Sequence, residues 1–358
     1  MKHSLILFAA CMLMVLPSCS STSALTAEQS IDTIMSDFSS PIGPGAAVVV
    51  MRNDSVIFRK GYGSASLNQN VPVTPFTNFR LASITKQFTA MCIMMLEEQG
   101  KLSFNDTIVK FFPDFPVYGK NITVRNLLNH TSGLPDYESL MPDSQTVQVL
   151  DADCLQLLYR ANSLYFPAGT KYQYSNTGYA MLALIVEKVS GKRFADFLKE
   201  NIFNKTGMAT TVAYEKGIST VANRAYGYSL LGGKWTETDQ SSTSAVLGDG
   251  GIYSNVEEMA RWISSLWSFK LISEKSQRLA WSDAALNDGT PIDYGMGWHT
   301  ETYRSVKHPH HGGSSLGFRN HILVFPNGKS MVIILTNRNQ GDPIIEAKKI
   351  AELLLTTH

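Results

Sequence analysis

Two strand–turn–strand patterns, one near each end of the chain, constrain the fold more than any other feature of the sequence. Residues 46–63 consist of an apolar run, a turn at residues 53–54 and a second apolar run, which is typical of a β-hairpin. Residues 321–336 repeat this pattern around a turn at residues 326–328. We therefore predict an α+β fold with one antiparallel sheet, built from both chain ends and flanked by helices.

Helical periodicity dominates the segment between the two hairpins. Apolar residues recur at helical spacing in residues 88–96, 179–189 and 256–267, and again at the end of the chain in residues 344–355. Gly100 and Gly191 follow the first two segments, where a helix-ending glycine is expected. Ser254 or Asn255 is expected to cap the third segment.

We expect these parts to form a single catalytic domain over residues 25–358. Its α/β part would comprise residues 25–80 and 290–358, and its inserted, mostly helical subdomain would comprise residues 81–289. Such an arrangement places a cleft between the two parts.

Charge and cysteine content exclude several classes of protein. The chain of 358 residues has 31 lysines plus arginines against 30 acidic residues, without a basic run, so it lacks the charge needed to bind nucleic acid. Four cysteines are too few for a disulfide scaffold. Cys92 and Cys154 lie in the body of the chain, where we expect buried thiols, although a bridge between them stays open.

The first 24 residues are typical of an export signal. Basic residues precede an apolar run at residues 5–16, which is too short to span a bilayer. Residues 16–19, Leu-Pro-Ser-Cys, resemble a bacterial lipobox, whose cysteine becomes the acylated N-terminus. We expect an exported, periplasmic lipoprotein anchored through Cys19 to a bacterial membrane, with the outer membrane favoured. Simple cleavage near Ala24 is the alternative.

Ser83 and Lys86 are the first candidates for catalysis. They lie three residues apart at the start of the first helical segment, so their side chains share a helix face. A serine hydroxyl becomes nucleophilic when a base takes its proton, and a lysine can be that base when burial or a nearby cation lowers its pKa. The motif alone is also compatible with a capping serine and a solvated lysine.

Tyr174 and Asn176 form the second candidate element. They belong to a Tyr-Ser-Asn tripeptide directly before the second helical segment. A phenol at the mouth of a loop can relay a proton, and an asparagine amide can hold a substrate carbonyl or the lysine. The same tripeptide recurs at residues 253–255, where we favour a structural role in capping a helix.

The third candidate element is His311-Gly312-Gly313-Ser314, which leads into the second hairpin. Glycines in or beside a strand let a substrate backbone approach closely, and the amide of Ser314 could pair with that of Ser83 as an oxyanion hole. Nearby histidines at positions 308 and 310 suggest a metal site. However, the strand period of two places His311 opposite its neighbour, and no cysteine or carboxylate lies close in sequence, so we expect no metal.

These three elements, Ser-x-x-Lys, Tyr-x-Asn and His-x-Gly in this order, resemble the active-site motifs of the penicillin-recognising serine hydrolases. The resemblance is to the branch that contains class C β-lactamases, D-alanyl-D-alanine carboxypeptidases and related esterases. It covers nearly all of the chain after residue 30 and includes residues 127–135, 167–179 and 250–254. It implies a β-lactamase/transpeptidase-like fold and acyl-enzyme chemistry without a metal or an organic cofactor.

The resemblance also implies a role for each motif residue. Ser83 would be the nucleophile, Lys86 would help to deprotonate it, and Tyr174 would shuttle protons. Four residues would bind the substrate: Asn176, His311, Gly313 and Ser314, the last through its backbone amide.

The third motif departs from that of class C β-lactamases, which usually carry Lys-Thr-Gly there. A histidine is mostly neutral at pH 7 and recognises a carboxylate less well than a lysine does. We therefore predict an exported serine hydrolase acting on small-molecule or peptide substrates, which are amides or esters of D-amino-acid, cell-wall-like or β-lactam-like type. The alternatives are an esterase, an acyltransferase to a hydroxyl acceptor, and an inactive peptidoglycan-binding lipoprotein.

Overall fold

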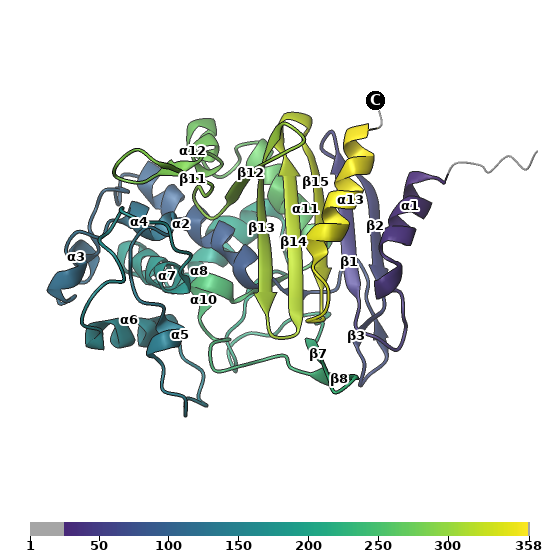
Figure 1. Ribbon diagram of the computed structural model, residues 1–358, viewed down its shortest axis with the longest axis horizontal. Helices are drawn as coiled ribbons and strands as arrows, with labels where there is room; N and C mark the ends of the chain where they lie inside the picture. Colours follow the sequence, from purple (N-terminus) through teal and green to yellow (C-terminus); the bar gives the residue numbers. More distant parts are fainter. Residues whose placement is uncertain (1–24, 357–358) are drawn as a thin grey trace, which may run out of the picture.

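The computed structural model describes residues 25–356 and contains the antiparallel sheet predicted from the two hairpins. Six strands of these residues form the sheet in the order β12-β13-β14-β15-β1-β2 (Figure 1). Their bounds are Ala46–Arg52 (β1), Ser55–Tyr62 (β2), His299–Tyr303 (β12), Val306–Ser315 (β13), Phe318–Phe325 (β14) and Ser330–Thr336 (β15). Strand β1 pairs with β15, so the two ends of the chain meet inside one sheet.

Both predicted hairpins are confirmed. Asn53 and Asp54 join β1 to β2 with φ of 52° and 61°, the backbone of a type I′ turn, which matches the twist of the strands it connects. A 3-10 turn, η5 (Pro326–Gly328), joins β14 to β15.

Helices cover both faces of the sheet (Figure 1). Helices α1 (Ala27–Ile34) and α13 (Pro343–Thr356) lie on one face, and α11 (Val256–Trp267) lies on the other. Alternate residues of β1 therefore enter different cores. Ala46, Val48 and Val50 pack on the α1 and α13 side. Ala47, Val49 and Met51 pack on the opposite side.

The remaining helices and short strands lie between β2 and β12 in the sequence. The helices are α2 (Lys86–Glu98), α3 (Ile108–Phe111), α4 (Val124–Leu128), α5 (Tyr137–Leu140), α6 (Asp151–Arg160), α7 (Asn176–Ser190), α8 (Phe194–Leu198), α9 (Asn204–Thr206), α10 (Leu247–Gly250) and α12 (Glu274–Ala280). The short strands are β3 (Ser64–Ser66), β4 (Val71–Pro72), β5 (Phe79–Arg80), β6 (Val212–Ala213), β7 (Tyr228–Leu231), β8 (Lys234–Glu237), β9 (Ile252–Ser254), β10 (Ala284–Ala285) and β11 (Pro291–Ile292). Residues 81–289 contain more helix than strand, and the strands there are two to four residues long.

Helix boundaries agree with the signals in the sequence. Gly100 and Gly191 follow α2 and α7 with φ of 68° each, a left-handed conformation that glycine adopts without strain. Of the two predicted caps of α11, the structure selects Asn255, whose side chain accepts from the backbone N–H of Glu258 at 3.0 Å. The hydroxyl of Ser254 bonds to Thr211 instead.

Cys92 and Cys154 are both buried free thiols, as expected, and no bridge joins them. The predicted export signal, with Cys19, lies outside the described residues. Within residues 25–356, none of the helices combines the length and the hydropathy needed to span a bilayer.

Candidate active site

Ser83 lies in a 3-10 turn, η2 (Ala82–Thr85), between β5 and α2. The residue before it, Ala82, has a φ of 50°, a left-handed conformation that costs an alanine roughly 1–2 kcal/mol. Asn320 of β14 anchors the chain just before the turn, because its Nδ2 donates to the carbonyl oxygen of Arg80 at 2.8 Å. The turn packs against β13 and β14, and the sheet therefore fixes the position of the serine.

Gly313 permits this close packing. A Cβ at position 313 would lie 2.1 Å from the carbonyl oxygen of Leu81, so any side chain would push η2 away from β13. The sequence suggested that a substrate backbone approaches this glycine. In the structure the approaching backbone is that of the chain itself.

Lys86 is fully buried and binds three acceptors from three elements. Its Nζ donates to Ser83 Oγ at 3.1 Å, to Asn176 Oδ1 at 2.9 Å and to the carbonyl oxygen of Asp249 at 3.0 Å. The lysine therefore does not reach into solvent, and the reading of a capping serine with a solvated lysine is wrong.

Asp249 lies in helix α10. The buried carboxylate of Asp151 caps the N-terminus of this helix. Asp151 accepts from the backbone N–H groups of residues 247 and 248 at 2.9 and 3.0 Å, and burial raises its pKa to about 7. The Asp249 carboxyl accepts from the hydroxyl of Tyr137 at 3.0 Å, and burial raises its pKa to about 6. Helix α10 thus places both a carbonyl and a carboxyl group beside Lys86.

Tyr174 lies over the lysine. The centroid of its ring is 4.9 Å from Lys86 Nζ, within range of a cation–π contact, and 4.2 Å from the ring of His130. Its hydroxyl is buried and has no hydrogen-bond partner among the described residues. Tyr174 lines the same cavity as Ser83.

Asn176 begins α7, where the side chain of Ser175 caps the helix. Its amide faces two charged groups: Oδ1 accepts from Lys86, and Nδ2 donates to Glu138 Oε1 at 3.4 Å. Of the two roles predicted for this amide, the structure shows the contact with the lysine.

His311 is buried, and protein groups contact both ring nitrogens. Nδ1 lies 2.6 Å from the carbonyl oxygen of Gly312, and Nε2 lies 3.1 Å from the hydroxyl of Tyr294. Because a carbonyl oxygen only accepts, Nδ1 carries the proton and Nε2 accepts from the tyrosine. Burial, reinforced by His299, holds the pKa of His311 well below its usual value. The ring is therefore neutral and offers no positive charge to a substrate.

Four further histidines lie on β12, β13 and β14: His299, His308, His310 and His321. Ring centroids of adjacent members are 5.2–5.4 Å apart, with His310 at the centre. His310 pairs with Leu323, which faces α13, whereas His311 pairs with Ile322, which faces the helical core. These two histidines thus lie on opposite faces, as the strand period predicts. Among residues 25–356, no group of three or more His, Cys, Asp or Glu side chains is arranged to hold a metal ion.

Ser83 lines two neighbouring cavities. The larger, of about 430 Å³, is also lined by Tyr174, His311, Gly313, Ser314 and Arg319. The smaller, of about 60 Å³, is also lined by Asn176, Ser314, Glu138 and Asp249. Lys86 contacts Ser83 from the buried side, so the structure brings all seven predicted site residues together.

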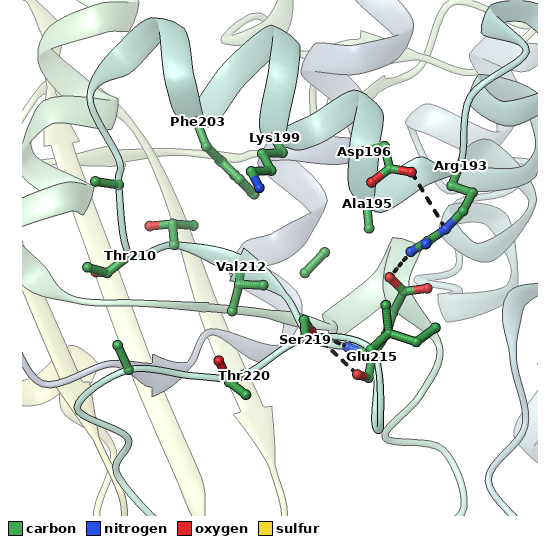
Figure 2. A pocket seen from close by; sticks show the side chains of 15 residues that line it. Arg193, Ala195, Asp196, Lys199, Phe203, Thr210, Val212, Glu215, Ser219 and Thr220 are labelled. Carbon is green, nitrogen blue, oxygen red and sulfur yellow. Dashed lines mark hydrogen bonds and ion pairs between the residues drawn. The ribbon is translucent and has the colours of Figure 1, made fainter.

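A third cavity, of about 470 Å³, lies apart from these residues between α8, a π-helical turn η4 (Lys199–Phe203) and residues 209–222 (Figure 2). Arg193 forms ion pairs there with Asp196 and Glu215. None of the predicted site residues lines this cavity, so its volume alone does not make it a candidate for catalysis.

Sequence reasoning missed six residues of the site: His130, Tyr137, Glu138, Asp249, Tyr294 and His299. Four of them are separated by tens of residues from every catalytic motif, and Asp249 contacts Lys86 through its backbone. Two of the six had a signal in the sequence. His130 lies within the family-like stretch 127–135, and Asp249 directly precedes the stretch 250–254.

Comparison with known proteins agrees with this geometry. The family model described as Beta-lactamase matches residues 37–355. Penicillin-binding protein 4* of Bacillus subtilis (strain 168) is 33% identical over 327 residues, which cover 86% of this chain and 71% of the relative.

Two solved structures share the fold. The octameric penicillin-binding protein homologue from Pyrococcus abyssi has a TM-score of 0.79 and 25% identity, covering 93% of this chain and 77% of that chain. The D-amino acid amidase from Ochrobactrum anthropi SV3 has a TM-score of 0.77 and 22% identity, covering 92% of this chain and 98% of that chain. The second likeness concerns the fold alone.

The fold is therefore β-lactamase/transpeptidase-like, and the protein is a serine hydrolase. The chain belongs to the β-lactamase family and is homologous to penicillin-binding proteins. The predicted family and fold class are confirmed.

Proposed function

We propose that the protein hydrolyses an amide bond through an acyl-enzyme on Ser83. The observation that carries this proposal is the 3.1 Å contact between Lys86 Nζ and Ser83 Oγ, at the junction of two cavities. Uncharged Lys86 accepts the hydroxyl proton while the serine oxygen bonds to the substrate carbonyl carbon. Asn176 and the Asp249 carbonyl accept the two N–H groups of the uncharged amine and so direct its lone pair toward the serine.

Tyr174 is proposed to complete the proton transfer. Its hydroxyl has no partner among the described residues, and Tyr174 lines the same cavity as Ser83. When the C–N bond of the tetrahedral intermediate breaks, the phenol donates its own proton to the leaving amine and is reprotonated by the ammonium group of Lys86, which holds the proton from Ser83. Water then attacks the carbonyl carbon of the acyl-enzyme, its proton passes through Tyr174 and Lys86 to Ser83 Oγ as the ester bond breaks, and the carboxylic acid is released.

The backbone amides of Ser83 and Ser314 are proposed to bind the oxyanion. Ser315 and Phe318 close the β13–β14 hairpin around a two-residue turn, and such a closing pair exchanges hydrogen bonds. Because these bonds alternate along the strand, the N–H of Ser314 is directed away from β14. Strand β12 pairs with β13 only as far as His310. Beyond His310, the edge of β13 that points away from β14 therefore faces η2. Each such donor is worth about 2.7–4 kcal/mol of the barrier.

The substrate proposed is an amide of a D-amino acid or of a cell-wall-like peptide. A protein that shares the fold, from Ochrobactrum anthropi, is named as a D-amino acid amidase. Both nitrogens of His311 are engaged within the protein, which argues against efficient capture of the carboxylate that β-lactams present. Arg319 lines the larger cavity and is the cation available there.

The same neutral His311 favours a second candidate, an esterase or an acyltransferase to a hydroxyl acceptor. An ester without a carboxylate needs no cation at this position. The acyl-enzyme would be the same, with an alcohol as the leaving group or as the acceptor.

Assays of the purified protein on a D-alanyl-D-alanine peptide, D-alanine amide, a penicillin and p-nitrophenyl acetate test the proposal. We expect turnover of at least one amide by the wild type and none by Ser83→Ala with an unchanged circular dichroism spectrum. Turnover of the ester alone favours the second candidate. Amide turnover by Ser83→Ala at the wild-type rate would contradict both.

We also infer export and lipid anchoring from the sequence of residues 1–24, and we retain the division into parts 25–80 with 290–358, and 81–289. Cys19→Ala should move the protein from the membrane fraction to the soluble fraction and abolish labelling by radioactive palmitate. Retention of this variant in the membrane fraction would contradict the anchor.

A further inference from the structure

The two cavities that meet at Ser83 differ in charge. The larger is lined by Arg319, by the carboxyl group of Asp342 and by the neutral ring of His311. The smaller contains the carboxyl groups of Glu138 and Asp249, together with the buried guanidinium of Arg80. A substrate that spans Ser83 therefore meets a different environment on each side of its scissile bond.

The charges inside the smaller cavity leave one carboxylate without a cation. Asp249 accepts from Tyr137, and Arg80 donates to the carbonyl of Ser244 at 3.0 Å. Lys86 directs its N–H groups to Ser83, Asn176 and a carbonyl. Within residues 25–356, no lysine, arginine or histidine nitrogen lies within ion-pair distance of Glu138, whose exposed side chain accepts from the amide of Asn176 and also interacts with Tyr137.

Negative charge also accumulates beside Glu138. Asp136 caps α5 by accepting from the backbone N–H of Glu138. Burial and the charge of Asp136 raise the pKa of Glu138, and this increase outweighs the lowering by Asn176, Lys86 and Tyr137. The cavity thus suits a positively charged group that arrives with the substrate.

The proposed mechanism fixes which end of the substrate this is. Tyr174, which protonates the leaving group, lines only the larger of the two cavities. The leaving group therefore occupies the larger cavity, and the acyl part occupies the smaller one, beside Glu138. In an aminoacyl group a single carbon separates the amino nitrogen from the carbonyl carbon.

We propose that Glu138 binds the ammonium group of the acyl part of the substrate, so that the enzyme prefers aminoacyl amides and esters with a free α-amine over their N-acylated forms. This inference rests on the proposed acyl-enzyme function. Asn176 positions the carboxylate through its 3.4 Å contact and links it to Lys86. Glu138 is thereby a specificity residue rather than a participant in proton transfer.

The test compares alanine p-nitroanilide with N-acetyl-alanine p-nitroanilide, each as both enantiomers. The variants are Glu138→Gln, which removes the charge but keeps an oxygen for Asn176, and the control Glu200→Gln, which removes an exposed carboxylate that pairs with Lys192. We expect the wild type and the control to favour the free amine by about 10- to 100-fold in kcat/KM. Glu138→Gln should lose this preference, mainly through a higher KM, with the N-acetyl substrate unaffected.

Other outcomes overturn the inference. Equal rates on both substrates by the wild type, or equal losses on both in Glu138→Gln, would show that the carboxylate does not select the amine. Reaction of Ser83 with a fluorophosphonate, measured in parallel, separates the two claims. If Ser83 reacts but neither anilide is cleaved, only the substrate assignment fails. If Ser83 does not react, the proposed function fails with it.

Discussion

Nζ of Lys86 lies 3.1 Å from Oγ of Ser83, and the two other acceptors of this amine come from helices α7 and α10. These partners are distant in sequence, so the alignment of the lysine with the serine depends on the packing of three helices. The active site is therefore sensitive to changes that do not touch the serine itself.

Lys86→Met should slow acylation of Ser83 by about 10²- to 10⁴-fold, the range for loss of a positioned base. It should also reduce the free energy of unfolding by about 1–3 kcal/mol, because Asn176 Oδ1 and the Asp249 carbonyl lose a buried donor. Acylation by a fluorophosphonate and urea denaturation measure the two effects. Lys199→Met, at the cavity in Figure 2, is the matched control and should change neither. Acylation at the wild-type rate in Lys86→Met would refute the role of the base.

Tyr174→Phe should reduce kcat by about 10²-fold or more with little change in stability, because the hydroxyl has no partner to lose among the described residues. Tyr253→Phe should do the reverse. Its hydroxyl accepts from Arg224 and Gln240, so its removal should cost about 1–3 kcal/mol of stability and leave kcat within a few-fold. If the two variants exchanged these effects, the choice between the repeated Tyr-Ser-Asn tripeptides would be wrong.

Gly313→Ala should inactivate the enzyme and destabilise it by about 1–3 kcal/mol, because the new Cβ would lie 2.1 Å from the Leu81 carbonyl oxygen. At Gly312 the nearest atom to such a Cβ is His321 Nδ1 at 3.4 Å, so Gly312→Ala should be tolerated. Thermal unfolding and ester hydrolysis distinguish the two variants. Equal behaviour of the pair would show that η2 does not depend on contact with β13.

The histidines of the sheet should make the fold sensitive to acid. Burial lowers the pKa of His299 to about 4, of His321 to about 3 and of His310 to about 2, although Glu301 lies 3.6 Å from His310. As the pH falls below about 6.5, the unfolded chain binds these protons before the folded chain does. The free energy of unfolding should therefore decrease between about pH 6.5 and 4, by up to about 1.4 kcal/mol per pH unit for each histidine.

Urea denaturation at pH 7.5, 6.0 and 5.0 measures this slope. Stability should be independent of these histidines above pH 7. His310→Gln removes one titrating ring. It should therefore reduce by about one the number of protons taken up on unfolding, which the slope measures. An unchanged slope in that variant would mean that His310 titrates alike in the folded and unfolded chains.

The sequence predicted the sheet and the three motif-bearing segments because each of these leaves a local signal. The turn at Asn53 and Asp54, the glycine after α7 and the apolar period of α11 are all visible within a dozen residues. The left-handed Ala82, the Asp249 carbonyl and the bond between Tyr294 and His311 leave no such signal. They depend on backbone conformation and on contacts between distant segments, which only the assembled fold defines.

The central claim is that Ser83 is the nucleophile, and its most direct test is the position of a covalent adduct. Treatment of the full chain with a fluorophosphonate, followed by intact-mass measurement and peptide mapping, should show one adduct per molecule, on Ser83. Ser83→Ala should show none while retaining the wild-type unfolding transition. An adduct on another residue of the wild type, or one that persists in Ser83→Ala, would contradict the account.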